Sequence, residues 1–134
     1  MNLPLQFNIY QDIENQLIHA TVIGQATPQE IVDMYKELTA LANKYYYTKL
    51  LVNISAVEIA YSSSHVLKVL NKLELILSNY KVARVACLAN YKNDLIESFS
   101  EKKSLNIKNF SDEESAKHWL CKANIASPKE AVAV

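Results

Sequence analysis

The chain has 134 residues, half of them hydrophobic, which is enough to bury the core of a single globular domain. Its 14 basic residues balance 14 acidic residues, and a formal net charge of zero argues against partners held by bulk electrostatics, such as nucleic acid or an anionic membrane. A single glycine excludes glycine-rich phosphate-binding loops, and no apolar run approaches the roughly 20 residues that span a bilayer.

Cysteine and arginine usage narrows the setting further. Cys87 and Cys121 lie far apart without a paired-spacing motif, so we interpret both as reduced thiols and predict a cytoplasmic protein. The first residues contain no basic region followed by an apolar run, so no signal peptide is predicted. The only arginine is Arg84, and this scarcity argues against a nucleotide-binding site. A net charge near zero also permits self-association, which leaves a homodimer open.

Two short, partly alternating segments at the N-terminus predict a β-hairpin. The segments are Leu5–Tyr10 and Leu17–Ile23, and turn-forming residues at Asp12–Asn15 separate them. Gly24 follows the second segment directly, so we expect the second strand to end there.

The sequence after the hairpin predicts an amphipathic helix. Thr27 can cap it, Pro28 suits the first helical position, and Glu30 stands at the acidic position of a capping box. Apolar residues then recur at helical spacing up to Lys44. The aromatic triplet Tyr45–Tyr47 could stack on bases or sugars, but we favour a helix-to-strand connection whose rings cover the rim of the core.

The middle of the chain combines a buried strand, a loop and a long helix. The continuous apolar run Lys49–Ile54 is typical of a central parallel strand, and we place a loop at Ser55–Tyr61 after it. A helix is predicted over Ser62–Asn79. Its inward face is formed by Val66, Val69, Leu70, Leu73, Ile76 and Leu77. Leu67 and Leu75 lie outside that face, as ordinary surface residues or as part of a surface for a partner or a second copy.

A further strand and helix follow. The apolar run Lys81–Ala89 predicts another buried strand, with Cys87 inside it as a small hydrophobic side chain. Asn90 and Asn93 mark a turn and a cap for a helix that runs to about Lys103.

The last strand and helix complete the order of elements. The strand is expected at Leu105–Phe110, and Ser111–Glu114 reads as a second capping box that starts the final helix. Trp119 is interpreted as the core anchor of that helix. We expect one domain over residues 1–123 and a flexible tail over 124–134.

The resulting element order predicts the fold class. Strands and helices follow one another as β-β-α-β-α-β-α-β-α, and such alternation implies parallel strands joined by right-handed crossovers. We therefore expect a single-domain α/β fold. Its sheet would be mixed and mostly parallel, with about five strands, about four helices and the N-terminal hairpin as an antiparallel edge.

Four segments, taken in order, resemble the STAS domain superfamily, and more closely its SpoIIAA-like (STAS/SEC14-like) branch of small bacterial proteins. Gly24–Glu30 is similar to the family's glycine turn into its first helix, and Lys49–Ile54 is similar to its central strand. Ala83–Ala86 resembles its Arg-apolar-Ala strand, and Phe110–Leu120 resembles its closing Phe, acidic cap and Trp-Leu pattern. The resemblance covers roughly residues 5 to 122.

The resemblance implies a regulatory function without catalysis. In anti-sigma-factor antagonists of this superfamily, the loop after the central strand reads Asp-Ser-Ser-Gly, and a partner kinase phosphorylates the serine after the Asp. The matching positions here are Tyr61–Ser64, which keep a serine at Ser62 but lack the Asp and the Gly. We therefore expect a non-enzymatic protein-interaction or regulatory module with a serine-bearing switch loop. The SEC14-like side of the resemblance implies an alternative, a carrier or sensor of a small apolar, lipid-like ligand.

The three serines at the start of the long helix have two interpretations. Serine is a preferred N-cap because its hydroxyl accepts from an unpaired backbone N–H, so Ser62, Ser63 and Ser64 can simply stabilise the helix. Alternatively they form a phospho-acceptor or anion site, because a phosphate there would meet free N–H groups and the positive end of the helix dipole.

A candidate partner surface surrounds these serines. It consists of Glu58, Tyr61, His65, Leu67 and Asn71, which lie in the expected loop or on the first turns of the helix. The expected partner is another protein or a second copy of the chain.

No pattern of residues predicts catalysis, a metal site or a cofactor. His19, His65 and His118 belong to different elements, and no His, Cys, Asp or Glu grouping has metal-ligand spacing. Ser62 and His118 could be combined with a carboxylate into a triad, but no glycine or nucleophile-elbow context accompanies the serine. We therefore expect no catalytic residues.

Overall fold

The computed structural model describes residues 4–59, 62–87 and 90–122. One sheet of five strands runs in the order β1-β2-β3-β4-β5. The strands are β1 (Gln6–Asp12), β2 (Leu17–Ala26), β3 (Lys49–Ile59), β4 (Lys81–Val85) and β5 (Asn106–Phe110). β1 pairs with β2 in antiparallel fashion, and the other neighbours are parallel. The expected mixed sheet with an antiparallel hairpin at one edge is confirmed.

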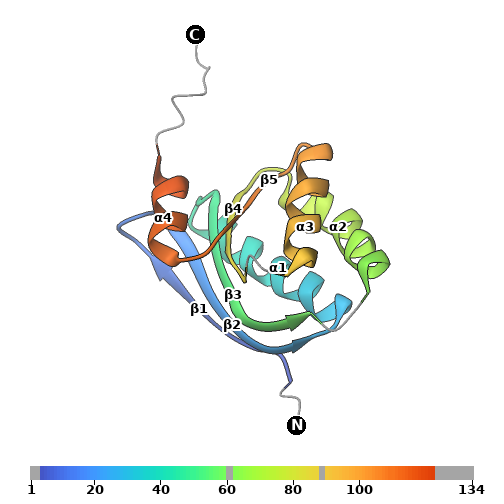
Figure 1. Cartoon of the computed structure of the whole chain (residues 1–134). Helices are drawn as coiled ribbons and strands as arrows, with labels where there is room; N and C mark the ends of the chain where they lie inside the picture. Colours follow the sequence, from blue (N-terminus) through green and yellow to red (C-terminus); the bar gives the residue numbers. More distant parts are fainter. Residues whose placement is uncertain (1–3, 60–61, 88–89, 123–134) are drawn as a thin grey trace.

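In the described parts of the chain, four helices occupy the two faces of this sheet. They are α1 (Pro28–Lys44), α2 (Ser63–Leu77), α3 (Tyr91–Lys102) and α4 (Glu113–Cys121). α1, α2 and α3 lie together on one side of the sheet, whereas α4 lies by itself on the other (Figure 1). Within the described part of the chain, no helix is long and apolar enough to cross a membrane.

Successive side chains of a strand point to opposite faces of the sheet, so each face has its own hydrophobic core. On β3, Leu50 and Val52 belong to the larger core beneath α1 and α2, while Leu51 between them points to the α4 side. There Leu51 packs with Ala116 and Leu120 of α4. Because the central strands are covered on both faces, their sequences read as continuous apolar runs.

The helix starts agree only partly with the sequence prediction. At α1, Thr27 and Glu30 form the expected capping box. At α3, Asn90 is the cap and accepts a hydrogen bond from the backbone N–H of Lys92. At α4 the expected capping box of Ser111–Glu114 is wrong. Asp112 is the cap instead, and it accepts from the backbone N–H of Ser115 at 2.7 Å.

Two strands are longer than expected because they pair with each other. β2 continues past Gly24 to Ala26, so the prediction that it ends at Gly24 is wrong. β3 continues past Ile54 to Ile59, and parallel pairing with β2 accounts for the added length. Most of the loop expected at Ser55–Tyr61 is therefore strand, and a register shift between Thr21 and Ile23 on β2 accommodates the extension.

β4 is shorter than expected. It ends at Val85 rather than Ala89, and Cys87 is exposed outside the strand. Just beyond the strand, the Asn93 amide of α3 donates to the Cys87 carbonyl oxygen at 2.8 Å. Residues 88–89 lie outside the described residues, as do residues 123–134, where the flexible tail was expected.

Two of the three tyrosines after α1 cover the core as expected. Tyr45 and Tyr47 pack against the larger core, and their ring centroids are 5.8 Å apart. Tyr46 projects outward with 92% of its surface exposed, and its positive φ of 62° turns the chain between helix and strand.

A buried arginine joins several elements on the three-helix side. Arg84 of β4 is only 5% exposed, and its two terminal nitrogens donate to the side-chain oxygens of Asn109 at 2.7 Å and Asn93 at 3.1 Å. The Asn109 amide in turn donates to the Asn93 carbonyl oxygen at 2.7 Å. These bonds connect β4, β5 and the first turn of α3 into one polar network.

This network predicts a large difference between two asparagines of β5. Asn109→Ala should lower the free energy of unfolding by about 1–3 kcal/mol, because it leaves a buried donor without its partner. Asn106→Ala, at an exposed position of the same strand, should change it by less than about 0.5 kcal/mol. Urea denaturation measures both variants, and equal effects would show that the Arg84 network contributes nothing particular to stability.

Candidate functional site

The candidate site lies where β3 leads into α2. β3 ends at Ile59 and α2 begins at Ser63, so the serines stand at the carboxyl end of a central parallel strand. This is the edge of an α/β sheet at which ligands and partners commonly bind. Ser62 and Ser64 are both exposed there.

The hydroxyl of Ser62 does not cap the helix. Ser62 occupies the N-cap position with extended backbone, but its side chain accepts no backbone N–H, so the prediction that it caps α2 is wrong. Its Oγ lies 3.0 Å from Ser64 Oγ and 2.9 Å from His65 Nδ1 instead. The physical reason is competition, because the hydroxyl of Ser64 and the imidazole of His65 take the place of the backbone N–H as hydrogen-bond partners of Ser62 Oγ. Three polar side chains thus form an exposed cluster at the helix start.

Positive groups surround this cluster. α2 has no acidic side chain in its first turn to offset the helix dipole. The Lys92 ammonium of α3 donates to the Ile59 carbonyl oxygen at 3.0 Å, which places a cation at the end of β3. Tyr91, also at the start of α3, brings its hydroxyl within 3.3 Å of Ser63 Oγ.

An open groove runs along α2 from His65 of this cluster, beside Pro28 at the start of α1. It has a volume of about 320 Å³ and is lined by Pro28, His65, Lys68, Val69, Asn71 and Lys72. His65 and Asn71 of the predicted partner surface therefore lie beside two lysines that the sequence analysis did not single out. The spacing of His65, Lys68 and Lys72, three and four residues apart, is the signal that places them on one helix face.

The other predicted surface residues do not join this groove. Glu58 is exposed but lies in β3, paired with Gln25 of β2, so its assignment to a loop is wrong. Leu67 is half-buried and does not line the groove. Leu75, at 88% exposure, is the outward leucine of α2. Tyr61 lies outside the described residues.

A small cavity lies beneath α2, between the helices and the sheet. Its volume is about 40 Å³, and its walls are apolar except for Arg84 and the hydroxyl of Tyr35. Burial raises the pKa of Tyr35, although the nearby Arg84 acts in the opposite direction. The volume corresponds to a few water-sized positions, at roughly 10–15 Å³ each, so it does not favour the alternative of a lipid carrier.

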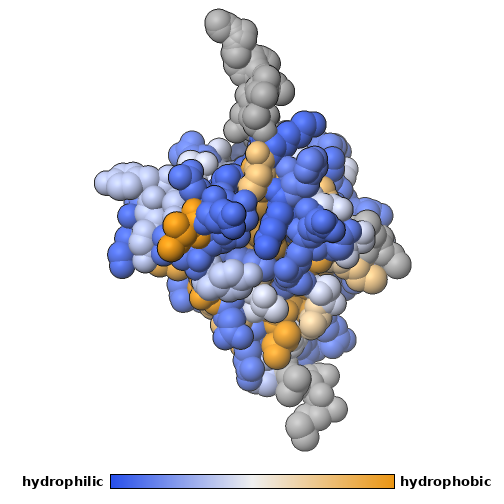
Figure 2. Space-filling view, turned by 90° about the vertical axis from the view of Figure 1, so that its left-hand side faces the viewer, coloured by the Kyte–Doolittle hydropathy of each residue, from blue (hydrophilic) through white to orange (hydrophobic). Residues whose placement is uncertain are grey.

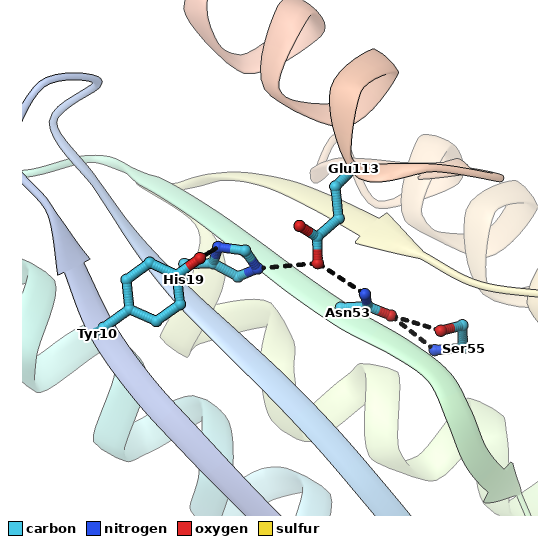
Figure 3. Close-up of polar contacts among 5 residues, drawn as sticks. All are labelled: Tyr10, His19, Asn53, Ser55 and Glu113. Atoms are coloured by element: carbon cyan, nitrogen blue, oxygen red, sulfur yellow. Dashed lines mark hydrogen bonds and ion pairs between the residues drawn. The ribbon is translucent and has the colours of Figure 1, made fainter.

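A second polar constellation lies on the α4 side of the sheet (Figure 3). His19 of β2 is buried, and its Nε2 lies 3.2 Å from Glu113 Oε2 at the start of α4. The same carboxylate oxygen accepts from the Asn53 amide at 2.7 Å. The hydroxyl of Tyr10, directly opposite His19 in the β1–β2 register, bonds to His19 Nδ1. Sequence reasoning missed this cluster because His19 and Glu113 are 94 residues apart.

Its electrostatics indicate a structural clamp rather than a reactive group. A neutral imidazole donates from one ring nitrogen only, so the carboxylate assigns the proton to Nε2 and Nδ1 accepts from Tyr10. Burial lowers the pKa of His19, outweighing the opposing effect of Glu113. Burial also raises the pKa of Tyr10, aided by the charge of Glu113, so the phenol stays protonated and is no activated nucleophile.

The carboxyl group of Glu113 is held in its charged form. Burial acts to raise its pKa, but the hydrogen bond from Asn53 and the interactions with His19 lower it overall. Glu113 therefore keeps the first turn of α4 fixed to the sheet.

The surface on the α4 and β1–β2 side is mostly hydrophilic, with separate apolar patches (Figure 2). In the described part of the chain, no group of three or more His, Cys, Asp or Glu side chains could hold a metal ion. Cys87 and Cys121 are both free and exposed.

Comparison with known proteins identifies the fold. No family model matches the sequence, and no curated protein matches it. Among solved structures, the chain is similar to the crystal structure of an anti-sigma factor antagonist from Mycobacterium paratuberculosis, with 15% sequence identity and a TM-score of 0.56. The match covers 87% of this chain and 94% of that chain. The STAS-like fold expected from the sequence is thus confirmed.

The buried His19 predicts a pH dependence of stability. Since its pKa is lower in the folded state than the ordinary value of 6.5, the unfolded chain takes up a proton first as the pH falls. Stability is therefore complete above pH 6.5 and declines below it, by at most about 1.4 kcal/mol per pH unit. Urea denaturation at several pH values between 7 and 5.5 measures this decline. This range lies above the one in which Asp12 and Glu113 titrate, because the pKa of each is lowered from its ordinary value.

Two variants isolate the contribution of His19. His19→Gln should flatten the dependence of unfolding free energy on pH in this range, whereas His118→Gln, at an exposed position of α4, should leave it as in the wild type. The assignment to His19 is wrong if the decline persists in His19→Gln or disappears in His118→Gln.

Proposed function

We propose that this chain is a non-enzymatic regulatory module that binds another protein through the start of α2. The observation that carries the proposal is the exposed cluster of Ser62, Ser64 and His65 at the head of a groove flanked by Lys68 and Lys72. The likeness to an anti-sigma factor antagonist, a protein that acts on another regulator, supports this reading at the level of the fold.

The groove favours a partner segment with acidic side chains. Lys68 and Lys72 are exposed, and together with the positive end of the α2 dipole they form a local basic surface on a chain of zero net charge. Complementary charge steers such an encounter and excludes partners of like charge. A second copy of the chain remains among the candidate partners.

Phosphorylation of Ser62 would alter this surface in a defined way. A phosphate adds about 1.5 to 2 negative charges at neutral pH. It would stand at the N-terminus of α2, on the Oγ atom that now lies 2.9 Å from His65 Nδ1, and would be stabilised by the free N–H groups of the first turn. The same charge would oppose binding of an acidic segment along Lys68 and Lys72. Ser62 is therefore our proposed phospho-acceptor, with Ser63 and Ser64 as neighbouring hydroxyls.

Catalysis is not part of the proposal. Ser62 and His65 form a serine–histidine pair, but no carboxylate among the described hydrogen bonds orients that imidazole. The two free thiols suit a reducing compartment, so we place the protein in the cytoplasm.

The proposal is tested by affinity capture from the cells of origin, followed by a binding titration with the captured protein. Lys72→Glu should weaken binding about tenfold or more, a loss of ~1.4 kcal/mol, because it opposes an acidic partner. Ser62→Glu should also weaken binding, and by more than Ser62→Ala, which removes the hydroxyl without adding a negative charge.

Matched controls carry the same charge changes elsewhere. Lys108→Glu lies on β5 and Ser98→Glu on the outside of α3, and both positions are exposed. Neither should affect binding. A partner that is insensitive to Lys72→Glu and Ser62→Glu, or equally sensitive to the two controls, would rule out the α2 surface.

A further inference from the structure

The small cavity beneath α2 has a polar feature that the proposed partner surface does not use. Its walls come from α1, α2, α3, β3 and β5, with side chains such as Ile54, Val66 and Ile96. Arg84 completes this wall from β4, and it is more than nine-tenths buried. The cavity therefore combines a mostly apolar lining with one cation and the phenol of Tyr35.

Among the described residues, no carboxylate forms an ion pair with Arg84. Asn93 and Asn109 supply neutral amide oxygens, and the neutral phenol of Tyr35 also interacts with the guanidinium. In residues 4–59, 62–87 and 90–122, the ion pairs are His19–Glu113 and Lys103–Glu74. The carboxylate of Glu97 lies near the network, but its contact there is with the Asn109 backbone nitrogen, at 3.4 Å, and not with the guanidinium.

A buried cation without a counter-charge is costly. Charged groups inside proteins are normally paired, because their transfer from water is unfavourable by several kcal/mol even after relaxation. A guanidinium carries five N–H donors, more than its contacts with Asn93, Asn109 and Tyr35 use, and its planar fork matches a carboxylate. An anion in the cavity would supply the missing charge.

The size of the cavity limits that anion. A volume of about 40 Å³ corresponds to roughly three or four water-sized positions. A carboxylate with a short alkyl group has about this many non-hydrogen atoms, whereas a nucleotide or a lipid chain has far more. The apolar walls suit an alkyl group and disfavour a second charge.

We propose that this cavity binds a small monocarboxylate anion, with its carboxylate paired to the Arg84 guanidinium and its alkyl group against the apolar wall. The site lies under α2, between the helix and the sheet, and Val69 lines both this cavity and the groove of Lys68 and Lys72. A bound anion would therefore stabilise the helix from within.

The test is an NMR titration of the full-length ¹⁵N-labelled chain at constant ionic strength. Sodium acetate is the probe, and acetamide is the uncharged control of similar shape. Acetate should produce saturable shifts of the Val66 and Ile96 amide signals and of the Arg84 Nε–H signal. Acetamide should produce none that saturate over the same concentrations.

Three variants assign the binding. Arg84→Met should lower acetate affinity about tenfold or more, whereas Lys68→Met removes an exposed cation of α2 and should bind as the wild type does. If Arg84→Met does not fold, Val66→Leu provides a second assessment, because it narrows the cavity, keeps Arg84 and should also weaken binding.

Several results would overturn the proposal. These are no saturable shift in the wild type, equal binding of acetamide, or wild-type affinity in a folded Arg84→Met or Val66→Leu variant. A loss of binding in Lys68→Met would place the anion on the outer surface instead.

Discussion

Burial of the one arginine constrains the three-helix side of the molecule. Arg84 is only 5% exposed, so its donors must be satisfied mainly by groups that the fold brings to it. Asn109 of β5 and Asn93 of α3 serve this purpose, and their mutual bond fixes where α3 begins relative to the sheet. The same side chain also lines the cavity beneath α2.

Different interactions determine the structure on the outer side of α2. Long parallel pairing carries β3 to Ile59, so the chain enters α2 at the carboxyl end of the sheet. The helix then begins with hydroxyls that bond to one another and to His65, while no side chain caps its first turn. Lys68 and Lys72 follow on the exposed face. A helix start with free N–H groups and nearby cations is suited to a negatively charged partner or modification.

Local patterns in the sequence predict much of this arrangement. The capping box of Thr27 and Glu30 and the buried runs of β3 and β4 depend on neighbouring residues, and they give the order and type of every element. Features that depend on distant partners escape such reasoning. The extension of β3 requires β2, the contact of His19 with Glu113 spans 94 residues, and the neutral partners of Arg84 come from two later elements. At the candidate site, the serine positions follow from the sequence, but the orientation of Ser62 toward His65 does not.

The central claim is that α2 presents the regulated binding surface, and hydrogen exchange of the purified complex tests it most directly. Exchange would be compared between the free chain and the chain bound to its captured partner. The account predicts added protection at the start of α2, from Ser63 to Lys72, with α4 unchanged. Added protection confined to α4 and the β1–β2 hairpin, with none on α2, would contradict it.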